Sequence, residues 1–66
     1  MKLGYIQEEI IRIAKEKGFI TSTEVLNYYP QKESKRQMTK LISLGFFESP
    51  EDCITYIKWN YTGKEL

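Results

Sequence analysis

The chain has 66 residues, the size of one small domain, and at this length a hydrophobic core alone supplies only about 3–5 kcal/mol. One cysteine and no histidine exclude an internal disulfide and a Cys/His zinc cluster, which leaves self-association or very good packing to add stability. The net charge of +1 selects no partner, whereas the lone cysteine and the lack of a long apolar run favour a cytoplasmic protein without membrane contact.

The first predicted element is a helix over about residues 3–17. Its apolar residues recur at spacings of three and four and form one stripe of Leu3, Ile6, Ile10, Ile13 and Ala14. A lysine-rich last turn followed by Gly18 is typical of a helix end. Ile11 falls outside the stripe, so we expect it to be exposed, either singly or, beside Tyr5, in a contact with another subunit.

A short extended stretch at Phe19–Ile20 leads into a second predicted helix over about residues 22–29. Residues 21–24, Thr-Ser-Thr-Glu, match a capping box, in which a hydroxyl and a glutamate three residues later bond reciprocal backbone groups. One side of this helix carries Val25, Leu26 and Tyr29, and we expect the first two to be buried. Pro30 ends it, because the residue before a proline avoids the helical conformation.

The third predicted helix covers about residues 31–44 and ends at Gly45. Its inward face is expected to consist of Ser34, Met38, Leu41 and Ile42. Polar residues occupy the opposite side, namely Lys32, Arg36, Thr39 and Ser43.

After Gly45 the pattern changes to a period of two, which predicts a two-stranded β-hairpin between about residues 46 and 59. Its strands are expected at 46–48 and 53–59, with the turn at 49–52. Thr55, Ile57 and Trp59 share one face and Ile54 and Tyr56 the other, and the pattern leaves open which face meets the helices. Residues 61–66 are expected to form a polar C-terminal tail after a domain of residues 1–60.

This order of elements resembles the winged helix-turn-helix family over nearly the whole chain. The most specific piece is residues 38–47, Met-Thr-Lys-Leu-Ile-Ser-Leu-Gly-Phe-Phe, which is similar to the family's passage from recognition helix through a glycine into the first wing strand. The opening of the second helix, Phe-Ile-Thr-Ser-Thr-Glu-Val-Leu, is similar as well. The resemblance implies an α+β fold of three helices with a C-terminal two-stranded hairpin wing, in which the third helix enters the major groove of DNA.

The distribution of charge supports that implication. Residues 31–45 carry four cations against one carboxylate, a net charge of +3, whereas residues 46–66 carry two cations against four carboxylates, a net charge of −2. The candidate DNA-binding residues are Lys32, Lys35, Arg36, Thr39 and Lys40. We expect Arg36 and Lys32 at base edges or phosphates, Thr39 at a base or sugar, and the other two lysines at flanking phosphates. A solvated surface helix carries similar charge, and it is the surrounding order of elements that favours DNA.

The predicted hairpin departs from the family pattern, in which the tip often carries a cation to a phosphate. Here the expected tip carries Glu48, Glu51 and Asp52 around Pro50, and phosphates repel carboxylates. We therefore expect that the hairpin does not contact DNA, so that the third helix binds alone or the hairpin faces a protein.

Catalytic chemistry is not expected of this sequence. It has no histidine base and no glycine-rich phosphate loop, and its carboxylates are scattered on polar faces. We accordingly expect no enzyme, cofactor, metal or small-molecule ligand. The larger aromatic residues and Cys53 are interpreted as packing residues.

The sequence thus favours a sequence-specific protein that binds double-stranded DNA, acts in transcription regulation and is compatible with a homodimer on two half-sites. One alternative is a winged-helix module for protein–protein interaction, using the acidic hairpin or the surface around Ile11 and Tyr5. Another is a structural subunit of a complex that processes nucleic acid.

Overall fold

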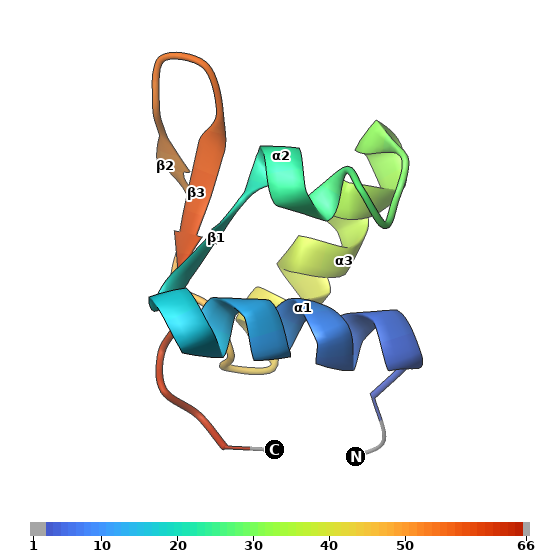
Figure 1. Ribbon diagram of the computed structural model, residues 1–66, viewed down its shortest axis with the longest axis vertical. Helices are drawn as coiled ribbons and strands as arrows, with labels where there is room; N and C mark the ends of the chain where they lie inside the picture. Colours follow the sequence, from blue (N-terminus) through green and yellow to red (C-terminus); the bar gives the residue numbers. More distant parts are fainter. Residues whose placement is uncertain (1–2, 66) are drawn as a thin grey trace.

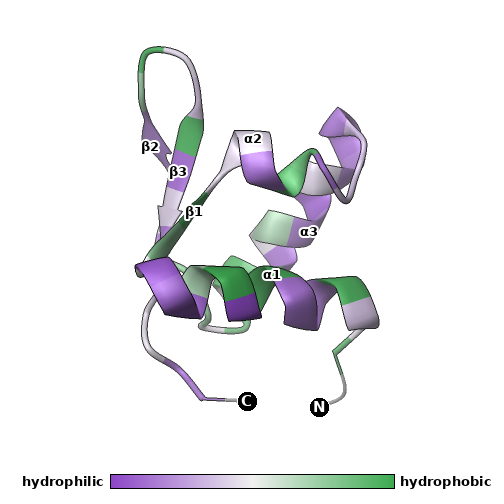
Figure 2. Ribbon diagram, viewed as in Figure 1, coloured by the Kyte–Doolittle hydropathy of each residue, from purple (hydrophilic) through white to green (hydrophobic). Residues whose placement is uncertain are grey.

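The computed structural model describes residues 3–65, and helix α1 (Tyr5–Lys17) lies across one end of the molecule (Figure 1). The helix ends as predicted at Gly18, where a φ of 88° and a hydrogen bond from its N–H to the Ala14 carbonyl close the last turn. Apolar residues of α1 gather on the side that faces the rest of the domain (Figure 2). The buried residues of this side are Gln7, Ile10, Ile11 and Ala14.

Ile11 is 0% exposed, so the expectation that it is exposed or contacts another subunit is wrong. The reason is Gln7, a polar residue within the buried stripe. Its side-chain oxygen accepts a hydrogen bond from the Gly4 N–H (2.8 Å), and its amide nitrogen donates to Gln37 on the third helix, α3 (Gln31–Ser43), at 2.6 Å. These bonds offset the cost of burying the amide. The buried side of the helix therefore includes Gln7, and because the prediction considered only apolar residues, it placed this side too far from Ile11.

Strand β1 (Phe19–Thr21) leads into helix α2 (Ser22–Val25) through the predicted capping box, which is confirmed. Thr21 Oγ1 accepts from the Glu24 N–H (3.4 Å), and the Thr21 N–H donates to the Glu24 carboxylate (3.1 Å). The helix is shorter than predicted because the next N–H groups bond three residues back and tighten into turns. Leu26 consequently leaves the helical face and is about half exposed, contrary to the expectation that it is buried.

Helix α3 (Gln31–Ser43) has the inward face that the sequence predicts. Ser34, Met38 and Leu41 are buried and Ile42 is half-buried. The Ser34 hydroxyl donates to the Gln31 carbonyl (2.8 Å), so its burial leaves no polar atom unsatisfied. Gly45, with a φ of 92°, turns the chain away from the helix axis.

The sheet is antiparallel and three-stranded, in the order β1-β3-β2, where β2 is Glu51–Asp52 and β3 is Ile57–Asn60. The prediction of a two-stranded hairpin therefore omitted one strand, because β1 pairs with β3 as well. Ile20 lies opposite Trp59 in this pairing, and both are buried. The face of β3 that carries Trp59 is thus the one that meets the helices.

The turn of the hairpin lies at residues 53–56 and not at 49–52 as predicted. The Cys53 N–H donates to the Tyr56 carbonyl (2.9 Å) and closes it. Phe47, expected to lie in the first strand, makes only an isolated bridge to Tyr61. Ser49 and Pro50 interrupt the ladder between this bridge and β2, since proline has no N–H to donate. The segment around Pro50, which was predicted to be the turn, instead interrupts the pairing on one side of the hairpin.

Residues after β3 continue to contact the domain. The Tyr61 N–H donates to the Gly18 carbonyl (2.9 Å), the Tyr61 ring meets Phe47 edge-on at 5.8 Å, and the Thr62 N–H donates to the Phe46 carbonyl (3.0 Å). The division after residue 60 stays a prediction, and Met1, Lys2 and Leu66 lie outside the described residues. Within residues 3–65, no helix is both long and apolar enough to cross a membrane.

Candidate nucleic-acid interface

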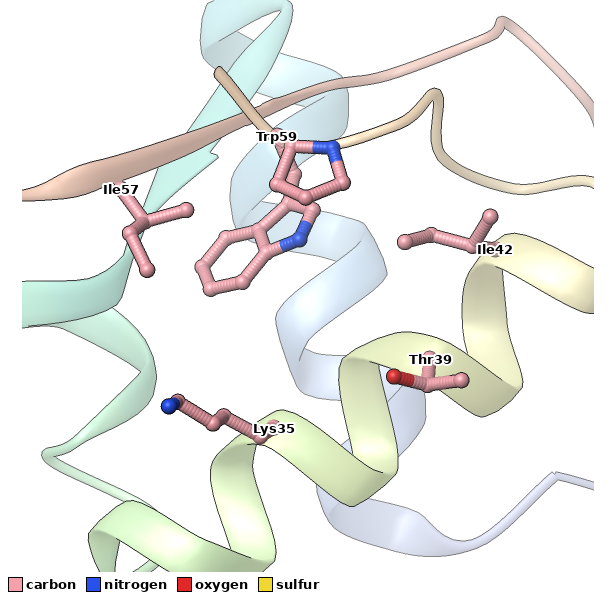
Figure 3. Close-up of a pocket in the computed structure, with 6 residues that line it drawn as sticks. Lys35, Thr39, Ile42, Ile57 and Trp59 are labelled. Carbon is pink, nitrogen blue, oxygen red and sulfur yellow. The ribbon is translucent and has the colours of Figure 1, made fainter. Parts of the chain in front are cut away.

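The outward side of α3 carries all five predicted binding residues, and each is exposed. They are held there because Met38 and Leu41 are fixed in the core on the opposite side of the helix. Lys32, Arg36 and Lys40 are four residues apart and form one row along the helix. Lys35 and Thr39 form a second row, and this row faces the hairpin (Figure 3). The predicted residues thus share one helix but divide between two neighbouring surfaces.

The cations of this side are little engaged within the chain. Among residues 3–65, no ion pair is recorded for Lys32, Lys35 or Lys40. Arg36 lies 3.6 Å from the Glu33 carboxylate, but its side chain is 81% exposed, and such a pair contributes little to stability. Glu33 also accepts a hydrogen bond from Gln37 (2.6 Å). The guanidinium of Arg36 can therefore leave this pair for a phosphate or a base edge.

A hollow of about 230 Å³ lies between α3 and the hairpin. Its lining combines the second row of α3 with apolar residues of the hairpin side, namely Lys35, Thr39, Ile42, Pro50, Ile57 and Trp59 (Figure 3). Its volume is below the ~300 Å³ at which small-molecule pockets begin. The sequence did not indicate this hollow, because its apolar residues match ordinary core positions and meet Lys35 only when the sheet packs beside α3.

The acidic residues of the hairpin form what we call the neck, Glu48, Glu51 and Asp52, and all three are exposed. Glu51 accepts a hydrogen bond from Asn60 (2.9 Å) and lies opposite Lys58 in the sheet. The Lys58 ammonium is 4.8 Å from the centre of the Phe19 ring and makes no ion pair with the neck. The tip, residues 53–56, contains no carboxylate. The prediction of an acidic tip is therefore wrong, and the negative charge lies below the tip.

Two titrating groups in the segment between α1 and the third helix, Glu24 and Tyr29, have altered pKa values. Burial, followed by the charge of Glu33, raises the pKa of Tyr29 above its ordinary value. Burial alone would raise the pKa of Glu24, but hydrogen bonds from Lys17 and Thr21 outweigh it, and the pKa is lowered. The Lys17–Glu24 ion pair joins the end of α1 to α2. Glu24 and Tyr29 belong to the segments that precede α3 and are not part of its outward side.

Comparison with known proteins identified no relative: no family model, no curated protein and no solved structure matches the chain. In the part of the chain that the structure describes, no three His, Cys, Asp or Glu side chains converge as metal ligands. The chemistry available on α3 is thus that of cationic donors and one hydroxyl on a rigid helix, which suits anionic oxygens and base edges.

Proposed function

We propose that this chain is a winged helix-turn-helix domain that binds double-stranded DNA with α3 in the major groove and acts as a small regulator of transcription. In this proposal Arg36 and Lys32 reach base edges or phosphates, Thr39 a base or sugar, and Lys35 and Lys40 the flanking phosphates. The hairpin stays off the DNA backbone, because its neck carboxylates are repelled by phosphates.

The observation that carries the proposal is the exposure of four cations and a threonine on α3, in two neighbouring rows that its buried residues leave free. At 13 residues α3 is about 20 Å long, enough to reach across a major groove about 12 Å wide. The order of three helices and a C-terminal hairpin agrees with the proposed fold. The net charge of +3 on residues 31–45 gives the electrostatic attraction that most DNA affinity requires.

A winged-helix module for protein interaction is the second candidate. It is favoured by one specific observation, the fully exposed Ile54 at the hairpin tip above an acidic neck. Such a module requires neither the row of Lys32, Arg36 and Lys40 nor a preference among DNA sequences. The two candidates therefore differ in what substitutions on α3 do.

The test is a titration of labelled DNA duplexes with the parent protein and with Arg36→Ala. If Arg36 reads a base, the variant should lose about 1–3 kcal/mol of binding energy and relax the preference at one position. If it binds only a phosphate, the loss should be equal for all sequences. Because Arg36 is exposed and weakly paired, the variant should keep the stability of the parent.

The matched control is Lys15→Ala, which removes one positive charge from α1. Lys15 pairs with Glu65 (2.7 Å) and lies on a different helix from the candidate site. It should change duplex affinity far less than Arg36→Ala does. Equal losses in the two variants would indicate nonspecific attraction to the whole protein, and absence of duplex binding at low salt would refute the proposed function.

A further inference from the structure

The hairpin ends in an apolar tip. Ile54 has a relative exposure of 102%, and Tyr56, two residues along the same turn, is also exposed. Figure 2 shows the apolar colour returning at this end of the molecule, far from α1. A single exposed isoleucine is ordinary, but this one belongs to a closed turn, and the hairpin that carries this turn extends to the end of the molecule away from α1 (Figure 1). The tip therefore presents an exposed apolar side chain that could insert into a cavity of a partner.

The negative charge beside the tip limits which kinds of partner can bind the tip. Asp52 directly precedes the turn, and Glu51 and Glu48 lie before it in the chain. No ion pair is recorded for these three carboxylates within residues 3–65. DNA and anionic lipid surfaces would repel them, so a partner for the tip must offer an apolar cavity with cations at its edge.

The chain itself carries such a cavity, the hollow beside α3. Ile42, Ile57 and Trp59 provide apolar walls, and Lys35 lies at its edge (Figure 3). Lys32 is one helical turn before Lys35 and lies in the neighbouring row of α3. The tip does not fill the hollow of its own chain, because Ile54 is fully exposed while Ile57 and Trp59 of the same hairpin form the walls.

We propose that the tip of one copy of this chain docks into the hollow of a second copy, with Ile54 as the inserted side chain. Asp52 pairs with Ile57 across the hairpin, and its side chain is therefore on the face that also lines the hollow. From this position it can meet Lys35 of the partner as the tip enters. A two-fold axis would make the exchange reciprocal, with two tips and two hollows in each dimer. Direct tip-to-tip pairing is disfavoured, since it would bring the two acidic necks together.

The docked tip would cover Lys35 and Thr39, two of the five candidate DNA-binding residues. Self-association and duplex binding should therefore compete for one surface, and a rising protein concentration would remove free binding helices. This consequence rests on the proposed function, whereas the dimer itself does not.

The first test is sedimentation equilibrium of the parent, Ile54→Ser and Tyr5→Ser up to about 1 mM, a range in which even weak dimers are populated. Ile54→Ser should raise the dissociation constant at least about 10-fold, since each dimer loses two buried side chains. Tyr5 is 87% exposed on α1, so Tyr5→Ser is the matched control and should dimerise as the parent does. A parent that stays monomeric over the whole range, or an Ile54→Ser variant that dimerises as the parent does, would overturn the proposal.

A charge exchange tests the predicted register. Lys35→Glu and Asp52→Lys should each weaken the dimer, and the chain that carries both should regain it, because both residues are exposed and the pair is restored with reversed sign. Failure of the double variant to recover, with its helical circular dichroism intact, would exclude this docking mode. Adding duplex DNA to the parent separates the two proposals. Dissociation of the dimer as duplex binds supports both the docking proposal and the proposed function. A dimer that persists and binds no duplex would contradict only the proposed function.

Discussion

Leu41 connects the core to the candidate interface, because it fixes the inner side of the helix whose outer side carries the cations. It is 0% exposed and packs in the main hydrophobic cluster. We expect Leu41→Ala to lower the free energy of unfolding by about 2–5 kcal/mol, since the substitution loses burial and leaves a cavity. In a domain of this size such a loss approaches the whole stability. Urea denaturation followed by circular dichroism measures it.

Leu26→Ala provides the same chemical change at an exposed position. It should alter the stability by no more than about 0.5 kcal/mol, as is usual for surface substitutions. If both leucine variants melted alike, Leu41 would not be a core residue, and α3 would not present its cations on the side opposite the core.

At the scale of single elements, the joint between α1 and α2 should respond to pH through Glu24. Its pKa is lowered in the folded chain, because hydrogen bonds from Lys17 and Thr21 outweigh the effect of burial. Such a carboxylate stabilises the fold fully above the ordinary value near 4.5 and loses this contribution as pH falls through the lower, folded value. We therefore expect Glu24→Gln to flatten the loss of stability below about pH 4.5 while keeping a side chain that can complete the capping box.

Thermal melts of parent and Glu24→Gln between neutral and acidic pH test this expectation. Glu8→Gln, at an exposed carboxylate in the first turn of α1, is the control and should follow the parent. Identical acid profiles for parent and Glu24→Gln would mean that this ion pair and capping box do not contribute to acid sensitivity.

The acidic neck of the hairpin gives a second prediction at this scale. Replacing Glu48 and Glu51 by Gln and Asp52 by Asn removes three negative charges from exposed positions. Duplex affinity should stay the same or rise slightly, because these carboxylates can only repel phosphates. A sharp fall in affinity with the fold intact would show that the hairpin contacts DNA directly.

For the whole molecule, the dependence of duplex affinity on salt counts the cations that one binding event uses. Each phosphate neutralised contributes about −0.9 to the slope of log affinity against log salt concentration. A single α3 that engages three or four of its cations should give a slope of about −3 to −4. Fluorescence anisotropy titrations at several salt concentrations measure this slope. A value twice as steep would mean that two copies bind one duplex through α3, contrary to the competition between dimer and DNA.

Apart from the early end of α2, the positions of the helices were determined by the sequence alone because their causes are local. The caps at Thr21 and Gly18 and the reversal at Gly45 each act within one turn of backbone. The inward side of α3 followed from apolar spacing, and the exposure of its cations followed from that side. The candidate binding residues on α3 could therefore be identified, as exposed positions, without any tertiary contact.

Tertiary structure decided what depends on residues far apart in the chain. Ile11 is buried because Gln7 can join the buried stripe through Gln37 on another helix. The hairpin gained a third strand because β1 pairs with residues about 40 positions later. The tip lies at residues 53–56 and not at 49–52, because residues 51 and 52 after Pro50 pair with β3. A segment with high β-propensity therefore forms the turn. The hollow beside α3 exists only after these pairings form, since local sequence patterns specify which elements form but not which surfaces they bring together.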